Sequence, residues 1–231
     1  MIPERKQLGI LAVVGIAIIG CTFAVHLYNP KLFPRVLGDF SPTAAAALFF
    51  AVGYMLLNYL QTRGWFLVYK APNRQGLLFA AGFAALFGIV AIPMDMLIVF
   101  PSDINVPLPD ALLFYPLVGL FAEVAFHLLP LALVLSALSF ILKDTDSNKY
   151  LWIGILAVAT IEPLYQTAWM VSLDRYAAWA VVYDAAHVFA INLVQLIAFR
   201  RYDFVSMVAL RFIYYLFWHI GWGHFRLYLL F

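Results

Sequence analysis

Six ionisable side chains stand at matching depth in the last four long apolar segments of the chain. They are Glu123, His127, Glu162, Asp184, His187 and His219. A carboxylate or an imidazole in hydrocarbon is costly unless it has a partner or faces a water-filled cavity, so such residues usually mark a functional site. Six of them at one level predict a chemical centre with catalytic potential.

Two pairs within this set have the spacing of neighbours on a helix. Glu123 and His127 are four residues apart, which is a spacing that helical metal sites use for two ligands. Asp184 and His187 are three apart, so the carboxylate could orient the imidazole by accepting its second N–H. Carboxylates and imidazoles suit a divalent metal such as zinc or iron, which would activate a bound water. The candidate ligands are Glu123, His127, His187 and His219. The simpler alternative is that Glu123 and His127 satisfy each other.

Proline follows two of these site segments. Pro163 comes directly after Glu162 and would free the carbonyl of Ala159, and Pro130 would free the carbonyl of Phe126. A helix break beside a buried carboxylate suits the wall of a cavity. We therefore predict distorted helices at the level of the site.

The last apolar segment carries the basic residues that bear on the site. Arg211, Tyr215 and His219 lie on one stripe, four residues apart each time. Arg211 could neutralise one of the carboxylates, or it could extend its long stem to the headgroups, and the second reading is favoured. Arg226 stands close to the far end of the segment and is expected to meet water.

Composition defines the class of protein. Of the 231 residues, 65% are hydrophobic and 11% are charged, against roughly 25% charged in soluble domains. The net charge of +2 is small and the basic residues are spread among short loops, which argues against nucleic acid as a partner. Cys21 is the only cysteine, so no intrachain disulfide can form. The sequence indicates a polytopic membrane protein whose main partner is the lipid bilayer.

Seven segments are long enough to cross the hydrocarbon core. They run approximately over 8–28, 43–61, 76–100, 111–142, 150–171, 176–199 and 204–231. Lipid leaves no water to pair backbone groups and the runs lack the alternation of strands, so helices are expected. The prediction is an all-α fold with about seven transmembrane helices, forming a single integral membrane domain over 1–231.

The positive charges beside the spans predict the orientation. An N-terminus in the cytoplasm places Arg5, Lys6, Arg63, Lys70, Arg74, Lys143, Lys149, Arg200 and Arg201 inside, and Lys31, Arg35 and Arg175 outside. This distribution favours an N-in, C-out topology in the plasma (inner) membrane.

The segment Ala122–His127, AEVAFH, is similar to a motif of a known protein family. The chain resembles the CPBP group of intramembrane proteases (CAAX prenyl protease and bacteriocin-processing proteins, Abi-type), whose pattern is EExxxR, FxxxH and HxxxN on successive helices. Glu123 matches the second glutamate, whereas Ala122 replaces the first and His127 replaces the arginine. Glu162 stands where the second motif has its histidine.

The third motif of the group has two candidates in this chain. His187 in HVFAIN is one, with Asn192 one position later than the pattern, and His219 in WHIGWG is the other. The resemblance implies hydrolysis of a peptide or prenyl-peptide, with water activated by the first glutamate and the second-motif histidine. The third-motif histidine and asparagine would support the oxyanion. Ala122 removes the carboxylate that the family would use as the base, whereas Glu162 or Asp184 could act as general base toward a metal-bound water.

Two hypotheses from other classes stand beside the hydrolase. A non-catalytic relative could bind a membrane partner, an isoprenoid lipid or a pigment through its aromatic side chains and histidines. A proton or ion carrier is the third, because carboxylate and histidine chains serve as relays in membranes. A relay requires polar residues that continue to both surfaces, and apart from Arg211 and Asp95 the sequence shows no such path.

Overall fold

The computed structural model describes residues 4–142 and 147–231. All regular secondary structure in these two ranges is helical, and seven helices are long and apolar enough to cross a membrane. The predicted all-α, polytopic membrane fold is thus confirmed. Lys143, one of the residues used to predict the orientation, lies outside the described ranges.

The first three spans are single helices and the fourth, fifth and seventh are interrupted. In chain order the elements are α1 (Glu4–Tyr28), α2 (Pro34–Leu37), α3 (Pro42–Thr62), α4 (Arg74–Ile98), η1 (Ser102–Ile104), α5 (Ala111–Ala122), η2 (Glu123–Leu128), α6 (Leu129–Leu142), α7 (Ser147–Ala159), α8 (Ile161–Ser172), α9 (Ala178–Arg201), α10 (Phe204–Tyr215), η3 (Leu216–Trp222) and α11 (Gly223–Leu229). Their bounds agree with the segments expected from the sequence to within a few residues.

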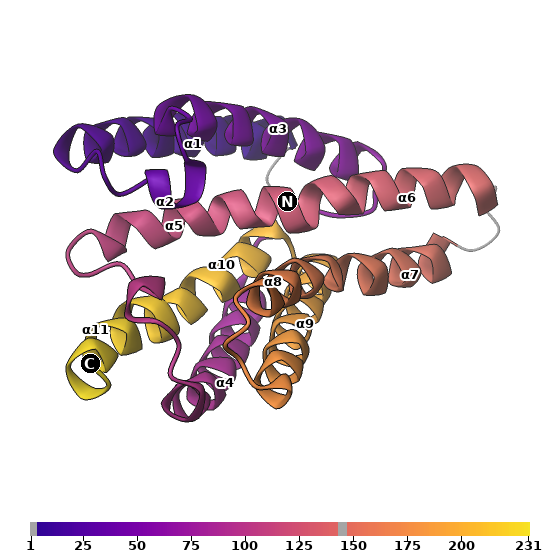
Figure 1. The fold of residues 1–231 in the computed structure, drawn as a ribbon. Coiled ribbons are helices and arrows are strands. Elements are labelled where there is room, and N and C mark those ends of the chain that lie inside the picture. Colours follow the sequence, from indigo (N-terminus) through magenta and orange to yellow (C-terminus); the bar gives the residue numbers. More distant parts are fainter. Residues whose placement is uncertain (1–3, 143–146) are drawn as a thin grey trace.

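The rod formed by α5 and α6 runs between two groups of helices (Figure 1). On one side of it α1 and α3 lie against each other, and on the other side α10 packs against α4 and α9. Gly15 permits the close approach of α1 and α3, because a Cβ at this position would overlap the ring of Phe50. The site residues belong to the rod, to α9 and α10 of the second group, and to α8 and η3 on the same side of the rod.

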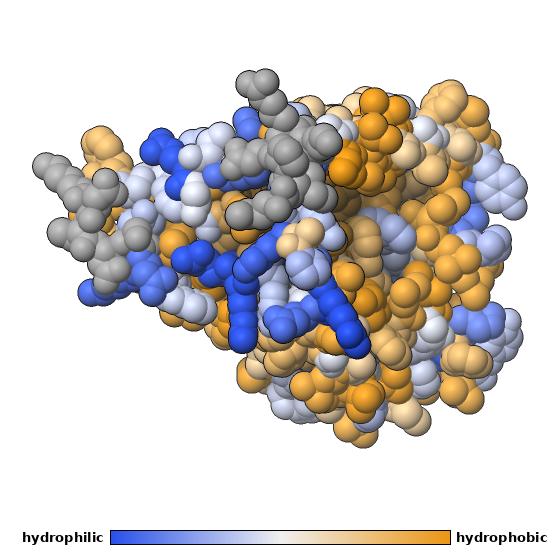
Figure 2. Space-filling view, turned by 180° about the vertical axis from the view of Figure 1, so that it is seen from behind, coloured by the Kyte–Doolittle hydropathy of each residue, from blue (hydrophilic) through white to orange (hydrophobic). Residues whose placement is uncertain are grey.

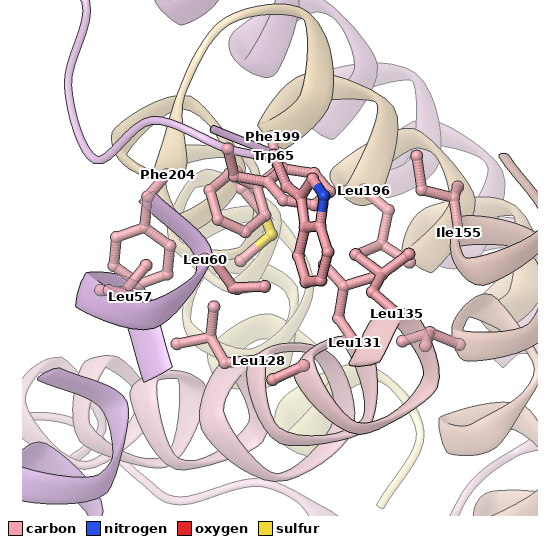
Figure 3. Close-up of a cluster of buried hydrophobic side chains, with 14 of the residues drawn as sticks. Leu57, Leu60, Trp65, Leu128, Leu131, Leu135, Ile155, Leu196, Phe199 and Phe204 are labelled. Atoms are coloured by element: carbon pink, nitrogen blue, oxygen red, sulfur yellow. The ribbon is translucent and has the colours of Figure 1, made fainter. Parts of the chain in front are cut away.

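The largest buried apolar cluster connects α3, α6, α7, α9 and the start of α10 (Figure 3). Its members include Leu57, Leu60, Trp65, Leu128, Leu131, Leu135, Ile155, Leu196, Phe199 and Phe204. Close packing, rather than exclusion from water, stabilises such a cluster in lipid. Leu128 directly follows His127 and Leu196 directly follows Gln195, so this packing also fixes two polar side chains of the site.

A buried aspartate anchors the start of α10. Asp203 is fully buried and caps the helix by accepting a bond from the backbone N–H of Ser206 at 2.8 Å. It also accepts bonds from the N–H of Lys70 at 2.8 Å and from Nδ2 of Asn73 at 3.0 Å. The segment before α4 is thereby attached to the seventh span.

The three interrupted spans break at the residues that carry the site. The fourth span turns into a π-helix over Glu123–Leu128, next to Pro130, which cannot donate a backbone bond. The fifth breaks at Thr160, just before the first turn of α8, which contains Glu162 and Pro163. The seventh contains a second π-helix around His219, whose carbonyl accepts a bond from Asn105 Nδ2 at 3.2 Å. Such π-segments occur frequently at functional sites, and the predicted distortions are confirmed.

Replacing Asp203 tests this anchor. We expect Asp203→Ala to lower the free energy of unfolding by roughly 2–4 kcal/mol, because it removes a helix cap and leaves buried donors unpaired. Thermal unfolding in detergent, followed by circular dichroism, measures the change. Asp39→Ala, at an exposed aspartate, is the matched control and should leave the midpoint unchanged. Equal midpoints for both variants would contradict the anchoring role.

Candidate functional site

Arg211 of α10 lies between two glutamates from other spans. Its side chain is 4% exposed, and Nε donates to Oε1 of Glu123 at 2.6 Å. Its two terminal nitrogens donate to the two carboxylate oxygens of Glu162, at 3.1 and 2.8 Å. This fork-to-fork geometry is one that guanidinium provides and ammonium does not. One side chain therefore joins the fourth, fifth and seventh spans.

The predicted extension of Arg211 to the headgroups is wrong. Two carboxylates at its own depth offer three charge-assisted bonds. Leaving those carboxylates without a cation would place uncompensated charges in the protein interior, which is strongly unfavourable. Arg211 instead neutralises the carboxylates of Glu123 and Glu162.

Glu123 has further partners beyond Arg211. Its Oε2 accepts a bond from Nδ1 of His127 at 2.6 Å, and its Oε1 accepts one from Nε2 of Gln195 at 2.5 Å. All three side chains are fully buried. Glu123 and His127 are therefore hydrogen-bonded to each other, which is the simpler of the two alternatives given for this pair. Gln195 connects α9 to the same network.

The charges of this network do not cancel by themselves. Glu123, Glu162 and Arg211 are 0–5% exposed and carry two negative charges and one positive charge when all are ionised. Burial of charge is costly unless each group is paired and hydrogen-bonded, and both carboxylates accept bonds from Arg211 and from a second side chain.

A partly open pocket of about 150 Å³ lies beside the network, between α4, α8, α9 and the seventh span. The polar side chains that line it include Glu162, Asp184, His187, Asn192, Arg211 and His219. A water molecule occupies about 30 Å³ in the liquid, so the pocket has room for roughly five waters or one small functional group. Pockets for whole drug-sized ligands are typically ~300–1,000 Å³. This pocket therefore fits the reacting group or headgroup of a larger molecule.

Four side chains around the pocket have buried polar atoms that pair with none of the described residues. These atoms are both ends of the Asn192 carboxamide, Oδ2 of Asp184, Nδ1 of His219 and Oη of Tyr183. Asn192 is only 1% exposed. Buried polar groups in native proteins are nearly always hydrogen-bonded, so these atoms indicate bound water or a ligand.

Asn192 comes five residues after His187, which on a regular helix places the two side chains on different faces, yet both line the same pocket. The reason is that the pocket extends along α9 from Asp184 to Asn192 and is lined by more than one face of that helix. His187 and Asn192, the pair compared with the third motif, therefore line one pocket, although their spacing differs from the family pattern.

The two pocket histidines are held by aromatic side chains. His187 Nε2 shares a hydrogen bond with Tyr214 Oη at 3.3 Å, which replaces the expected bond to Asp184. The ring of His219 stacks on Tyr115 at 4.5 Å and meets the edge of Tyr215 at 4.7 Å. Both imidazoles are thus fixed in position.

The described residues do not fit the predicted zinc or iron site. Among them, no group of three histidine, cysteine, aspartate or glutamate side chains comes close enough to hold a metal ion. Glu123 and His127 are bonded to each other, and His187 is bonded to Tyr214. The four proposed ligands are thus not brought together, because most of them have found protein partners.

Arg226 was expected to meet water, and this prediction is wrong. The side chain is fully buried and pairs with Asp95 of α4, with Nε 2.6 Å from Oδ2. It also donates to the carbonyls of Phe100 and Pro101 and to Oδ1 of Asn105. Opposite charges near the same ends of the third and seventh spans were the signal that could have revealed this pair.

The pair formed by Asp95 and Arg226 also shapes the pocket. It fixes the loop after α4, and Phe100 and Ile104 of that loop line the pocket wall. Tyr176, outside the spans, packs against Phe100 with ring centroids 5.8 Å apart. Burial raises the pKa of the Tyr176 phenol, so it stays protonated at neutral pH. The loop wall of the pocket is thus well defined.

No protein-family model, no curated protein and no solved structure matches this chain. The fold and the site define the class to which it belongs. It is an all-α integral membrane protein whose described residues form seven helices long and apolar enough to span a membrane, with a buried network of two glutamates and one arginine.

Asn192 and Gln195 provide a matched test of the site, because both are buried carboxamides on α9. Gln195 donates to Glu123, whereas Asn192 pairs with none of the described residues. We expect Gln195→Met to lower the free energy of unfolding by roughly 1.5–3 kcal/mol, since it removes a bond to a charged group. Asn192→Leu should leave stability equal or higher. Thermal unfolding in detergent distinguishes the two, and an equal loss would show that Asn192 has a structural partner.

Proposed function

We propose that this protein is an intramembrane hydrolase similar to the CPBP group. In this proposal, the pocket takes the amide or ester bond of a membrane-anchored substrate such as a peptide or prenyl-peptide. One observation carries the proposal: unpaired polar atoms of Asp184, Asn192 and His219 surround the same pocket as Glu162. A base, an oxyanion donor and space for water are what carbonyl hydrolysis requires.

Asp184 and His219 are the candidate bases. Each has a free acceptor atom, Oδ2 or Nδ1, that could take the proton of an attacking water. Glu162 is a weaker candidate because both of its oxygens accept bonds from Arg211. In the resemblance, Ala122 and Glu162 occupy the positions that activate water, so the base here would come from α9 or η3 instead.

Asn192 and Arg211 would stabilise the negative charge that develops on the carbonyl oxygen. Nδ2 of Asn192 is an unpaired donor at the pocket, and the guanidinium of Arg211 also lines it. Prearranged donors and positive charge in a water-poor site are a large part of catalysis in such reactions. Glu123 and Glu162 would then act by positioning Arg211 rather than by touching the substrate.

We further propose an N-in, C-out orientation in the plasma membrane. The described residues that support it are the exposed side chains of Arg63, Arg74, Arg200 and Arg201, which all lie at the ends of spans assigned to the cytoplasmic side. The loop that carries Phe100 and Ile104 then lies on the outer side, and so does the neighbouring part of the pocket.

A non-catalytic binding role is the second candidate, and the saturation of the glutamates favours it. Glu123 accepts bonds from Arg211, His127 and Gln195, and Glu162 accepts bonds from Arg211 and Gln166. The pocket would then hold the polar group of an isoprenoid lipid, a pigment or a membrane partner without reacting with it.

The proton or ion carrier is less well supported by the packing. One helical turn from the network, toward the end of α9 at Arg201, the buried side chains are apolar: Leu131, Phe199 and Met207. A relay needs polar groups or water along its whole path. This apolar layer interrupts such a path on one side.

A farnesylated peptide with a fluorophore and quencher tests hydrolysis and binding in one assay. In liposomes we expect the parent protein to cleave it, and Asp184→Asn or His219→Gln to lower kcat by about 10²–10⁴-fold, the usual contribution of general acid–base catalysis. Asp174→Asn, at an exposed aspartate of the adjoining loop, should keep full activity.

The same reporter separates the two candidate functions. Binding that is weakened by Asn192→Leu, without cleavage by the parent, would overturn the hydrolase and support the binding role. If the protein neither binds nor cleaves the reporter, both roles are contradicted for this substrate class.

A further inference from the structure

A second cavity lies on the opposite side of α10 from the polar pocket. It is an apolar groove of about 520 Å³ between α1, α3, α5 and α10. Its walls include Val14, Phe50, Leu120, Val208, Ala209 and Phe212. No residue lines both the groove and the polar pocket, so the two cavities are separate sites.

The length of the groove matches one leaflet of a bilayer. Along α1 it extends from Gln7 to Ile18, which is about 16 Å at 1.5 Å per helical residue. The hydrocarbon core is about 30 Å thick, so one leaflet contributes about half of that. Another apolar cavity, of about 300 Å³, adjoins the groove. It shares Val14, Ile18 and Phe212 with the groove and continues toward Val25. The shape fits an extended acyl chain.

One end of the groove is bordered by two segments that are bonded to each other. Val68 and Tyr69 belong to one segment, and Phe204 and Val205 belong to the other. The N–H of Phe204 donates to the carbonyl of Leu67 at 2.9 Å, which keeps the segments side by side.

These two segments carry a cluster of basic side chains. Lys70, Arg74, Arg200 and Arg201 are all exposed. The acid between them, Asp203, is fully buried and its oxygens accept bonds within the protein. Figure 2 shows hydrophilic side chains gathered on one part of this side of the molecule and apolar ones over the rest. An apolar groove thus ends at a patch of positive charge.

We propose that the groove is a binding site for an anionic phospholipid. One acyl chain lies between α1 and α10, and the phosphate lies against Lys70, Arg74, Arg200 and Arg201. Charge complementarity selects an anionic headgroup over a zwitterionic one, because basic residues at the end of a span attract anionic lipids. This site is independent of the reaction proposed for the polar pocket.

Native mass spectrometry after reconstitution with equal amounts of phosphatidylglycerol and phosphatidylcholine of the same chains tests the site. We expect one retained lipid per chain, with phosphatidylglycerol preferred by at least roughly fivefold. Ala209→Phe fills the groove and should remove this lipid, whereas Ala137→Phe, at an exposed position of α6, should not. Val14→Trp fills the groove from α1 and replaces Ala209→Phe if the latter does not fold.

The headgroup contacts are tested by two variants of equal charge change. Lys70→Gln with Arg74→Gln should reduce the preference for phosphatidylglycerol several-fold, and Lys31→Gln with Arg175→Gln, at the opposite ends of the spans, should preserve it. Retention of the lipid in the groove-filling variant, or equal retention of both lipids by the parent, would overturn the proposal. Displacement by glycerol 3-phosphate alone would overturn the role of the acyl chain.

Discussion

The structure depends on one interaction, the pairing of Arg211 with Glu123 and Glu162. These three groups lie in the interior of a membrane protein, where an uncompensated charge is strongly unfavourable. Their pairing requires the fourth, fifth and seventh spans to meet at one depth and in one rotation. The helices adapt to this requirement, because η2, the break at Thr160 and η3 all occur at the level of the network.

The network also determines what the neighbouring pocket offers to a ligand. Arg211 donates to both oxygens of Glu162, so the unpaired polar atoms at the pocket, among the described residues, are those of Tyr183, Asp184, Asn192 and His219. On the other side of α10, the apolar side chains of Ala209 and Phe212 line a groove of different character. One helix thus separates a polar site for chemistry or recognition from a surface suited to a lipid chain.

Much of the fold and part of the site could be predicted from the sequence. Seven long apolar segments predict the spans, and Pro130 and Pro163 indicate the distortions, because these are local properties. The sequence offered carboxylate pairing for Arg211 only as the second choice, and it indicated the pair of Asp95 and Arg226 only through opposite charges near the same ends of two spans. A long side chain reaches several depths, and tertiary packing decides among them. The predicted metal ligands are not brought together either. Glu123 and His127 have the spacing of two ligands on a helix, but they are hydrogen-bonded to each other.

A double-mutant cycle between Arg211 and Glu162 tests the central claim most directly. The free energies of unfolding of Arg211→Met, Glu162→Gln and the double variant would be compared with that of the parent in detergent. If the pair is buried and bonded as described, each single change costs roughly 3–5 kcal/mol. The double variant then loses much less than the sum, with a coupling of at least about 2 kcal/mol. Additivity within about 0.5 kcal/mol would show that Arg211 does not pair with Glu162 and would contradict the account.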